Sequence, residues 1–256
     1  MIRTSKKVFA EAAAHGIAEY PRESCGYIVD AHGLKYFPCQ NLATTANQQF
    51  KIGGKDYMAA SKLGKIVGVV HSHPDGAARP SEGDLAACEA SRLPWHILAV
   101  HRGDSGDLAV VDRYSWQPSG YRAPLVGRSF FYGVLDCWAL ARDWYLEELG
   151  IELADVDHGP DGWWQTDSDF SPYEDEANYE KAGLVRLPKG TPLQLGDLLV
   201  MQLQSKSGKP NHVAVLIDPD RSIILHHLYG SLSDRTVYGG FWQEATRFIL
   251  RHKSRV

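Results

Sequence analysis

The chain has 256 residues, of which 44% are hydrophobic and 23% charged, and its formal net charge at pH 7 is −4. This length suits one large domain or two of ordinary size, and the composition is that of a soluble globular protein. Its 27 basic and 31 acidic residues are well mixed, so a nucleic-acid partner is not expected. No apolar run approaches the length needed to cross a bilayer, so stable membrane insertion is not expected either.

The N-terminus starts with the basic residues of a signal peptide but lacks the apolar core that should follow. Glu11, His15 and Glu19 interrupt this segment, which favours an amphipathic first helix. Without an export signal, we expect folding in the cytoplasm with reduced thiols. The four cysteines are unevenly spaced and form no CxxC pair: Cys25, Cys39, Cys88 and Cys137.

The first half of the chain alternates between helical and strand patterns, which predicts an α/β sandwich around a mixed sheet. The expected elements in chain order are a helix at 6–18, a hairpin of strands at 26–30 and 34–38, a helix at 56–63, a strand at 66–70, a helix at 82–91, and strands at 96–101 and 108–112.

Two imidazoles follow the predicted strand at 66–70. Residues i and i+2 of a strand point to the same side, so His71 and His73 can aim at one point. Asp84 lies eleven positions after His73, where a helical pattern begins. Ser81-x-x-Asp84 is by itself the pattern of a helix capping box. Two His and one Asp nevertheless make a three-ligand set with a free fourth position, which favours a catalytic zinc site.

This segment resembles the signature of the JAMM (MPN+) metallopeptidases, which is His-x-His-Pro followed by Pro-Ser-x-x-Asp. An upstream Glu-Ser-Cys-Gly run, starting at Glu23, matches the family's Glu-x-Cys-Gly. The resemblance implies a three-layer sandwich of the cytidine deaminase-like kind, with Zn²⁺ as the cofactor. It also implies that His71, His73 and Asp84 bind the zinc, that Glu23 is the general base for zinc-bound water, and that Ser81 stabilises the oxyanion. The signature positions are His71, His73, Pro74, Pro80, Ser81 and Asp84.

A loop-rich segment with several Pro and Gly residues separates the two halves, which predicts a domain at 1–115, a linker at 116–127 and a second domain at 128–256. In the second half, a helix is expected to begin at Cys137 and to stop at Gly150. A long loop-like segment follows at about 154–178. Three strands are then expected: one after the turn at Gly196, one at 212–217 and one at 222–228. A helix followed by a run of strands is an α+β pattern.

Cys137 stands at the start of the predicted helix, where the helix dipole and free amide groups favour a thiolate. His212 begins one predicted strand and His226 ends the next. A cysteine, a histidine and a third polar residue are the parts of an activated thiol nucleophile. By spacing alone the pattern is weak, because a lone cysteine in a helix is usually a small core residue.

The run Asp-Cys-Trp-Ala-Leu around Cys137 resembles the nucleophile segment of NlpC-type cysteine peptidases, which are papain-like enzymes that cut cell-wall peptides. The Gly-Asp-Leu turn at 196–198 and the His-Val strand at His212 are similar to that family too. The resemblance implies a papain-like fold with Cys137 as nucleophile, His212 as base and His226 as the orienting residue. Apolar residues at 224 and 225 leave the choice between His226 and His227 open.

Two further features favour structural interpretations. Trp163 and Trp164 could line a sugar or peptide groove, but paired aromatics in a long loop more often anchor the loop to a core. The basic tail from Arg247 to Arg255 is expected to be a short solvated segment.

A JAMM-type and an NlpC-type domain in one chain resemble the tail assembly proteins of lambdoid phages. The resemblance implies tail tip proteins and peptidoglycan peptides as partners, and the host cytoplasm as the place of assembly. It also implies peptidase activity, with cysteine-dependent hydrolysis of wall stem peptides beside a second, zinc-dependent peptidase site. Two alternatives stay open: an isopeptidase that processes a protein during tail assembly, or an inert structural component. Presence in the tail tip of the finished particle is also open.

Overall fold

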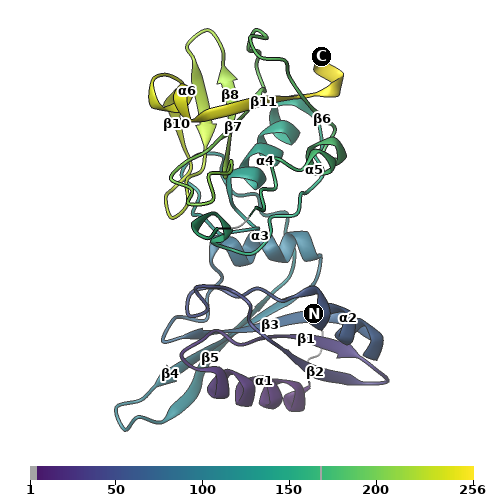
Figure 1. The fold of residues 1–256 in the computed structure, drawn as a ribbon. Helices are drawn as coiled ribbons and strands as arrows, with labels where there is room; N and C mark the ends of the chain where they lie inside the picture. The colour runs from purple at the N-terminus through teal and green to yellow at the C-terminus, as the bar shows by residue number, and fades with distance from the viewer. Residues whose placement is uncertain (1–4, 168) are drawn as a thin grey trace. The chain divides into compact units, whose positions relative to one another are not determined.

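The computed structural model describes residues 5–167 and 169–256, and it divides into two compact units between Arg122 and Ala123 (Figure 1). This division falls inside the segment 116–127, whose limits as a linker stay a prediction. Each unit has its own sheet.

Unit 1 is a mixed sheet in the order β2-β1-β3-β4-β5, in which β3 and β4 are parallel and the other described neighbours are antiparallel. Helix α1 covers one face and α3 lies on the other (Figure 1). The predicted α/β sandwich is confirmed. Its elements are α1 (Lys6–Glu19), β1 (Cys25–Asp30), β2 (Leu34–Cys39), α2 (Gly54–Leu63), β3 (Lys65–Pro74), α3 (Glu82–Ser91), β4 (Trp95–Arg102) and β5 (Leu108–Trp116).

Neighbouring apolar residues of β3 pack on opposite faces of the sheet. Val70 packs with Val8 of α1, whereas Val69 packs with Cys88 of α3. Because side chains alternate along a strand, His71 and His73 share the face of Val69. The strand therefore directs both imidazoles toward the layer that contains α3.

Unit 2 combines helices with an antiparallel sheet in the order β10-β9-β8-β7-β11-β6. Helix α4 packs its buried aromatic and aliphatic side chains against one face of that sheet, which confirms the α+β pattern. The elements are α4 (Cys137–Leu149), η1 (Trp163–Gln165), α5 (Glu176–Lys181), β6 (Leu184–Arg186), β7 (Leu198–Met201), β8 (His212–Asp218), β9 (Ile223–His226), β10 (Asp234–Val237), α6 (Phe241–Ala245), β11 (Thr246–His252) and η2 (Lys253–Arg255).

The C-terminal segment corrects the prediction of a solvated basic tail. Most of it forms β11, which pairs with β7 and β6 inside the sheet. Arg251 is buried, and its guanidinium donates to both carboxylate oxygens of Asp197, at 2.7 and 2.9 Å. The basic composition was misleading because a buried carboxylate neutralises this arginine.

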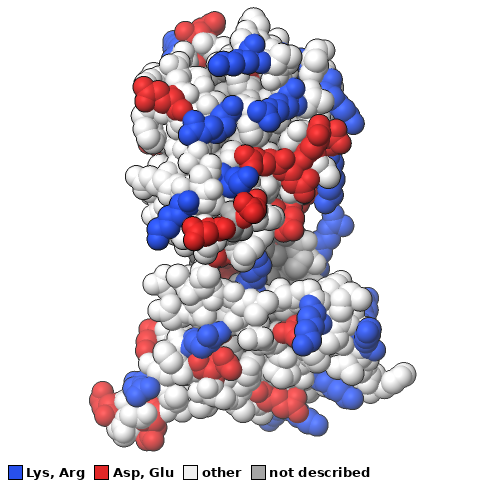
Figure 2. Space-filling view, in the orientation of Figure 1, with Lys and Arg blue, Asp and Glu red and all other residues white. Residues whose placement is uncertain are grey.

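On the face shown in Figure 2, acidic and basic side chains are interspersed over both units. Among the described helices, none is both long enough and apolar enough to span a membrane.

Candidate functional sites

The end of β3 and the start of α3 bring three predicted residues of unit 1 together. The Nε2 atoms of His71 and His73 lie 3.1 Å apart. The Asp84 carboxylate lies 3.2 Å from Nε2 of His71 and 3.5 Å from Nε2 of His73. His71 is fully buried and Asp84 is 8% exposed, so the cluster is shielded from solvent.

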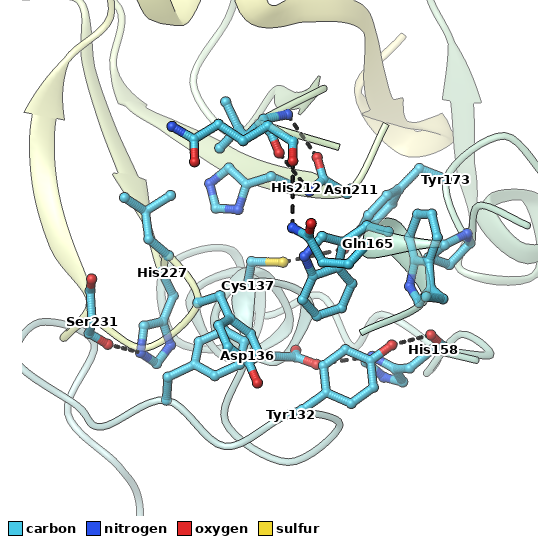
Figure 3. Close-up of a pocket in the computed structure, with 18 of the residues that line it drawn as sticks. Tyr132, Asp136, Cys137, His158, Gln165, Tyr173, Asn211, His212, His227 and Ser231 are labelled. Carbon is cyan, nitrogen blue, oxygen red and sulfur yellow. Dashed lines mark hydrogen bonds and ion pairs between the residues drawn. The ribbon is translucent and has the colours of Figure 1, made fainter. Parts of the chain in front are cut away.

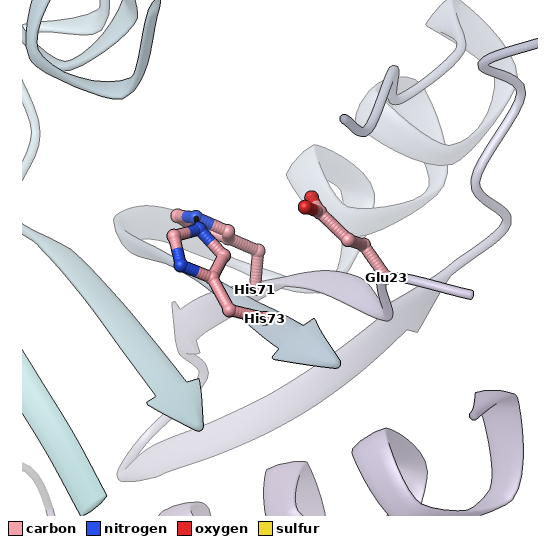
Figure 4. Close-up of side chains that lie close together, drawn as sticks. All are labelled: Glu23, His71 and His73. Carbon is pink, nitrogen blue, oxygen red and sulfur yellow. Dashed lines mark hydrogen bonds between the residues drawn. The ribbon is translucent and has the colours of Figure 1, made fainter. Parts of the chain in front are cut away.

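Glu23 lies in the segment before β1, and its carboxylate faces the two imidazoles (Figure 4). Glu23, His71 and His73 each present a possible ligand atom within 4.8 Å of the others. Burial raises the pKa of Glu23 to about 8, against a smaller lowering by His73. A carboxyl group with a pKa near neutrality is suited to proton transfer.

Two polar residues hold the backbone around Glu23 in place. Ser72 points to the opposite face of β3 from its histidine neighbours, and its Oγ accepts the backbone N–H of Ser24 at 2.8 Å. The buried Asn41 side chain donates to the carbonyl oxygen of Glu23 at 2.9 Å. The sequence analysis missed Asn41, because an asparagine in a loop carries no distinguishing pattern.

Ser81 belongs to a complete capping box at the start of α3. Its Oγ accepts the backbone N–H of Asp84 at 3.1 Å, and the Asp84 carboxylate accepts the backbone N–H of Ser81 at 2.8 Å. The Ser81 hydroxyl also donates to the same carboxylate at 2.7 Å. The structural and the metal-site interpretations of this motif are therefore compatible. The predicted oxyanion role of Ser81 stays a prediction.

The donor set of unit 1 fits a zinc ion. Zn–ligand bonds of 2.0–2.1 Å place two ligand atoms of a tetrahedron about 3.3 Å apart. The two Nε2 atoms lie 3.1 Å apart, and the Asp84 carboxylate approaches His71 with Oδ1 at 3.2 Å and His73 with Oδ2 at 3.5 Å, all close to that value. His73 Nδ1 lies 2.9 Å from the carbonyl oxygen of Ala77, which would leave Nε2 as the ligand atom. Burial alone would raise the pKa of Asp84, but His71 and His73 hold it well below its usual range. Asp84 is therefore ionised, as a ligand must be.

The second cluster lies in unit 2. Cys137 is the first residue of α4, whose N-cap Asp136 accepts the backbone N–H groups of Trp138 and Ala139, both at 3.0 Å. Cys137 and His212, the first residue of β8, line one cavity of about 370 Å³ (Figure 3). The structure thus brings the predicted nucleophile and base to the same cavity.

In the free protein, burial opposes the thiolate expected at Cys137. Burial raises the pKa of this thiol to about 12, and the neighbouring Asp136 carboxylate adds to the effect. Burial also lowers the pKa of His212 to about 3. Burial therefore favours a neutral thiol and a neutral imidazole over the ion pair.

The two candidates for the third position have different surroundings. The His226 ring at the end of β9 lies edge-to-face with the His212 ring, with their centroids 5.6 Å apart. The His227 ring instead packs against Phe130, and its Nε2 lies 3.2 Å from the carbonyl oxygen of Ser231. This arrangement favours His226 beside the base, while its role as the orienting residue stays a prediction.

The segment between α4 and α5 supplies residues that the sequence analysis missed. The Tyr173 hydroxyl lies 3.3 Å from the sulfur of Cys137. His158 contacts Asp136 at 3.0 Å and Asp155 at 3.1 Å. Burial would lower the pKa of His158, but these two carboxylates raise it to about 10. No sequence pattern marks a tyrosine or histidine within such a long irregular segment.

The two adjacent tryptophans both line the cavity beside Cys137. Trp163 is 3% exposed and packs edge-to-face on Phe170, as expected of an anchor. Trp164 is half-buried, and both interpretations of this residue stay open.

Comparison with known families matches both units. Residues 5–117 match the family described as prokaryotic homologs of the JAB domain. Residues 112–251 match the NlpC/P60 family. These matches confirm the JAMM-like fold predicted for the first half and the NlpC-type fold predicted for the second.

Two relatives extend over most of the chain. The tail tip assembly protein K of Escherichia phage N15 is 41% identical over 251 residues, which cover 97% of this chain and 95% of that protein. The protein of the same name from Escherichia phage lambda is 34% identical over 200 residues, covering 78% of this chain and 88% of that protein. A solution structure of a Salinibacter ruber protein is 26% identical, with a TM-score of 0.33, and covers 46% of this chain and 83% of its own. The family assignment therefore rests on the phage relatives.

Proposed function

Because the chain belongs to the family of the phage tail tip assembly proteins K and carries an NlpC/P60 domain, we propose that unit 2 is a cysteine peptidase that hydrolyses peptidoglycan stem peptides. The observation that carries this proposal is the placement of Cys137 and His212 on one cavity, with the thiol at the first turn of a helix. Nucleophile and base are the minimal machinery for acyl transfer through a thioester.

The neutral resting pair sets the order of proton transfer. His212 accepts the thiol proton as the sulfur attacks the amide carbon, and the resulting imidazolium donates that proton to the leaving amine. Water then attacks the thioester while His212 takes one proton from it, and the regenerated thiol leaves with that proton. His226 beside His212 would orient the imidazole.

The proposal is tested with purified peptidoglycan sacculi and the full chain. We expect the wild-type protein to release new peptide fragments, detected by mass spectrometry, and Cys137→Ala to release none. Cys88→Ala is the matched control, since Cys88 is a buried thiol in unit 1. Equal release by the wild type and Cys137→Ala would contradict the proposal.

A second activity is proposed for unit 1, on the basis of its buried donor set. His71, His73 and Asp84 would hold Zn²⁺, which supplies a polarised carbonyl and an acidified water when bound. Glu23, with its carboxylate facing the imidazoles, would move the proton. The substrate of this site would be a peptide or isopeptide bond, including one in a tail protein during assembly.

The same family membership supports a proposal for where the protein acts. The relatives are tail tip assembly proteins, so we propose other tail tip proteins as partners and the host cytoplasm as the site of assembly. A wall-directed peptidase would then reach peptidoglycan with the phage particle. Immunodetection of the chain in purified virions, compared with unassembled lysate fractions, tests this delivery.

A further inference from the structure

The cavity beside Cys137 carries no uncompensated charge. Among the described residues that line it, there is no Lys, Arg or Glu. The carboxylate of Asp136 contacts His158 at 3.0 Å and accepts backbone N–H groups from Gly133, Trp138 and Ala139. The part of the substrate that contacts this lining away from Cys137 and His212 is therefore expected to be polar but neutral.

One side of the cavity is built from ring systems, which we call the aromatic wall: Phe130, Tyr132, Trp164 and Tyr229. Tyr229 lies at its centre, 5.1 Å from the Phe130 ring and 5.2 Å from the Trp164 ring, and Trp164 lies 5.6 Å from Tyr132. The wall is continuous, yet Tyr229 is 53% exposed. Large, exposed aromatic surface at a cavity mouth is more typical of a binding site than of a core.

The backbone holds Trp164 in position without burying its ring. Its carbonyl oxygen accepts the backbone N–H of Lys206 at 2.9 Å, and the hydroxyl of Ser205 reaches the same oxygen at 3.4 Å. The adjacent Trp163 anchors the segment by burial. A ring fixed in this way needs little further ordering when a ligand packs on it.

A neutral, amphipathic ring matches this surface. The negative face of an aromatic ring attracts weakly positive C–H groups, and a pyranose ring presents several of these on one face and hydroxyl groups at its edge. The carboxylates of a stem peptide would gain nothing from the negative faces of these rings. Resting on the proposed peptidase function, we propose that Trp164 and Tyr229 bind an N-acetylated sugar ring, so that the Cys137 site selects stem peptides still linked to glycan.

The test compares one stem peptide in two forms, linked to its N-acetylated disaccharide or freed from it. We expect wild-type kcat/KM to be at least tenfold higher for the linked form. Tyr229→Ala and Trp164→Phe should reduce that preference, measured as the ratio of kcat/KM for the linked form to kcat/KM for the free peptide. Tyr229→Leu retains an apolar side chain without the ring, and it should behave like Tyr229→Ala if stacking is responsible. Tyr57→Ala in unit 1, with 52% exposure in the wild type, is the control and should change neither value.

The outcomes separate this inference from the proposed function. Equal hydrolysis of both forms by the wild type would overturn the sugar site and leave the peptidase intact. Hydrolysis of neither form would count against the peptidase, and the sugar site is then judged by binding. We expect the N-acetylglucosamine dimer to change tryptophan fluorescence in Cys137→Ala and not in Cys137→Ala/Tyr229→Ala. No saturable change in Cys137→Ala would overturn the sugar site.

Discussion

The two candidate sites handle charge in opposite ways. In unit 1 an ionised Asp84 lies against two imidazoles, and Glu23 adds a second carboxyl group. In unit 2 burial favours the neutral forms of both Cys137 and His212. The first arrangement suits a bound cation. The second suits a site in which the Cys137 thiol transfers its proton to His212 only when a substrate is bound. The comparison teaches that the two proposed sites would depend on different reagents, a metal ion in one and a transferred proton in the other.

The largest effect expected in unit 2 is the loss of the base. His212→Ala should lower kcat/KM for stem-peptide hydrolysis by at least about 10³-fold, because the neutral thiol would lack its proton acceptor. His226→Ala should cost less and His227→Ala least, since the His227 ring packs on Phe130 instead of His212. Steady-state kinetics with the three variants measure this order. A larger loss for His227→Ala than for His226→Ala would reassign the third residue.

The buried ion pair between Arg251 of β11 and Asp197 should stabilise unit 2 and have no effect on the stability of unit 1. Arg251→Met would leave the buried Asp197 carboxylate without its partner and lower the free energy of unfolding by about 3–5 kcal/mol. Urea unfolding of the full chain, followed by tryptophan fluorescence, measures this change.

The exposed pair of Arg221 and Asp218 is the matched control, with atoms 3.9 Å apart. Arg221→Met should change the free energy of unfolding by less than about 0.5 kcal/mol. Equal effects for Arg251→Met and Arg221→Met would show that burial does not control the strength of these pairs.

A third experiment sharpens the role of Ser81 in unit 1. Ser81→Ala removes the hydroxyl that donates to Asp84, so zinc affinity should fall about 10–100-fold. Competition titration with a zinc chelator measures the affinity. Ser91→Ala, which removes a hydroxyl at the other end of α3, is the control. Unchanged affinity with reduced turnover would instead support the oxyanion role that the family resemblance implies.

The last prediction concerns the pH dependence of the unit 2 thiol. With a pKa of about 12, the thiolate fraction of Cys137 is small at neutrality and grows with pH. The rate of alkylation by iodoacetamide should therefore rise about tenfold per pH unit between pH 7 and 10. Peptide-level mass spectrometry separates Cys137 from the other cysteines. A plateau near neutral pH would show a preformed thiolate–imidazolium pair.

Sequence patterns predicted the parts of each site that follow from strand periodicity or from a motif. His71, His73 and Asp84 lie within one short stretch, and alternation along β3 places both imidazoles on one face. Cys137 and His212 came from family motifs that mark element starts. The protonation state of Cys137 was not predictable, because it depends on burial by residues distant in sequence.

Dependence on residues distant in sequence also explains the other errors and omissions. Asn41 and Tyr173 contact their sites from irregular segments, where residue type alone indicates nothing. Arg251 carries the charge of a solvated tail, but its environment is set by Asp197 in another part of the chain. Long-range pairing, rather than local pattern, decides each of these positions.

The most direct test is peptide release from purified sacculi by the full chain after removal of bound metal with a chelator. If the unit 2 site works without the metal ion of unit 1, the metal-free wild type should release stem-peptide fragments at the same rate as the untreated protein. Cys137→Ala should release none, with or without zinc. Release that disappears with the metal but survives Cys137→Ala would contradict this account.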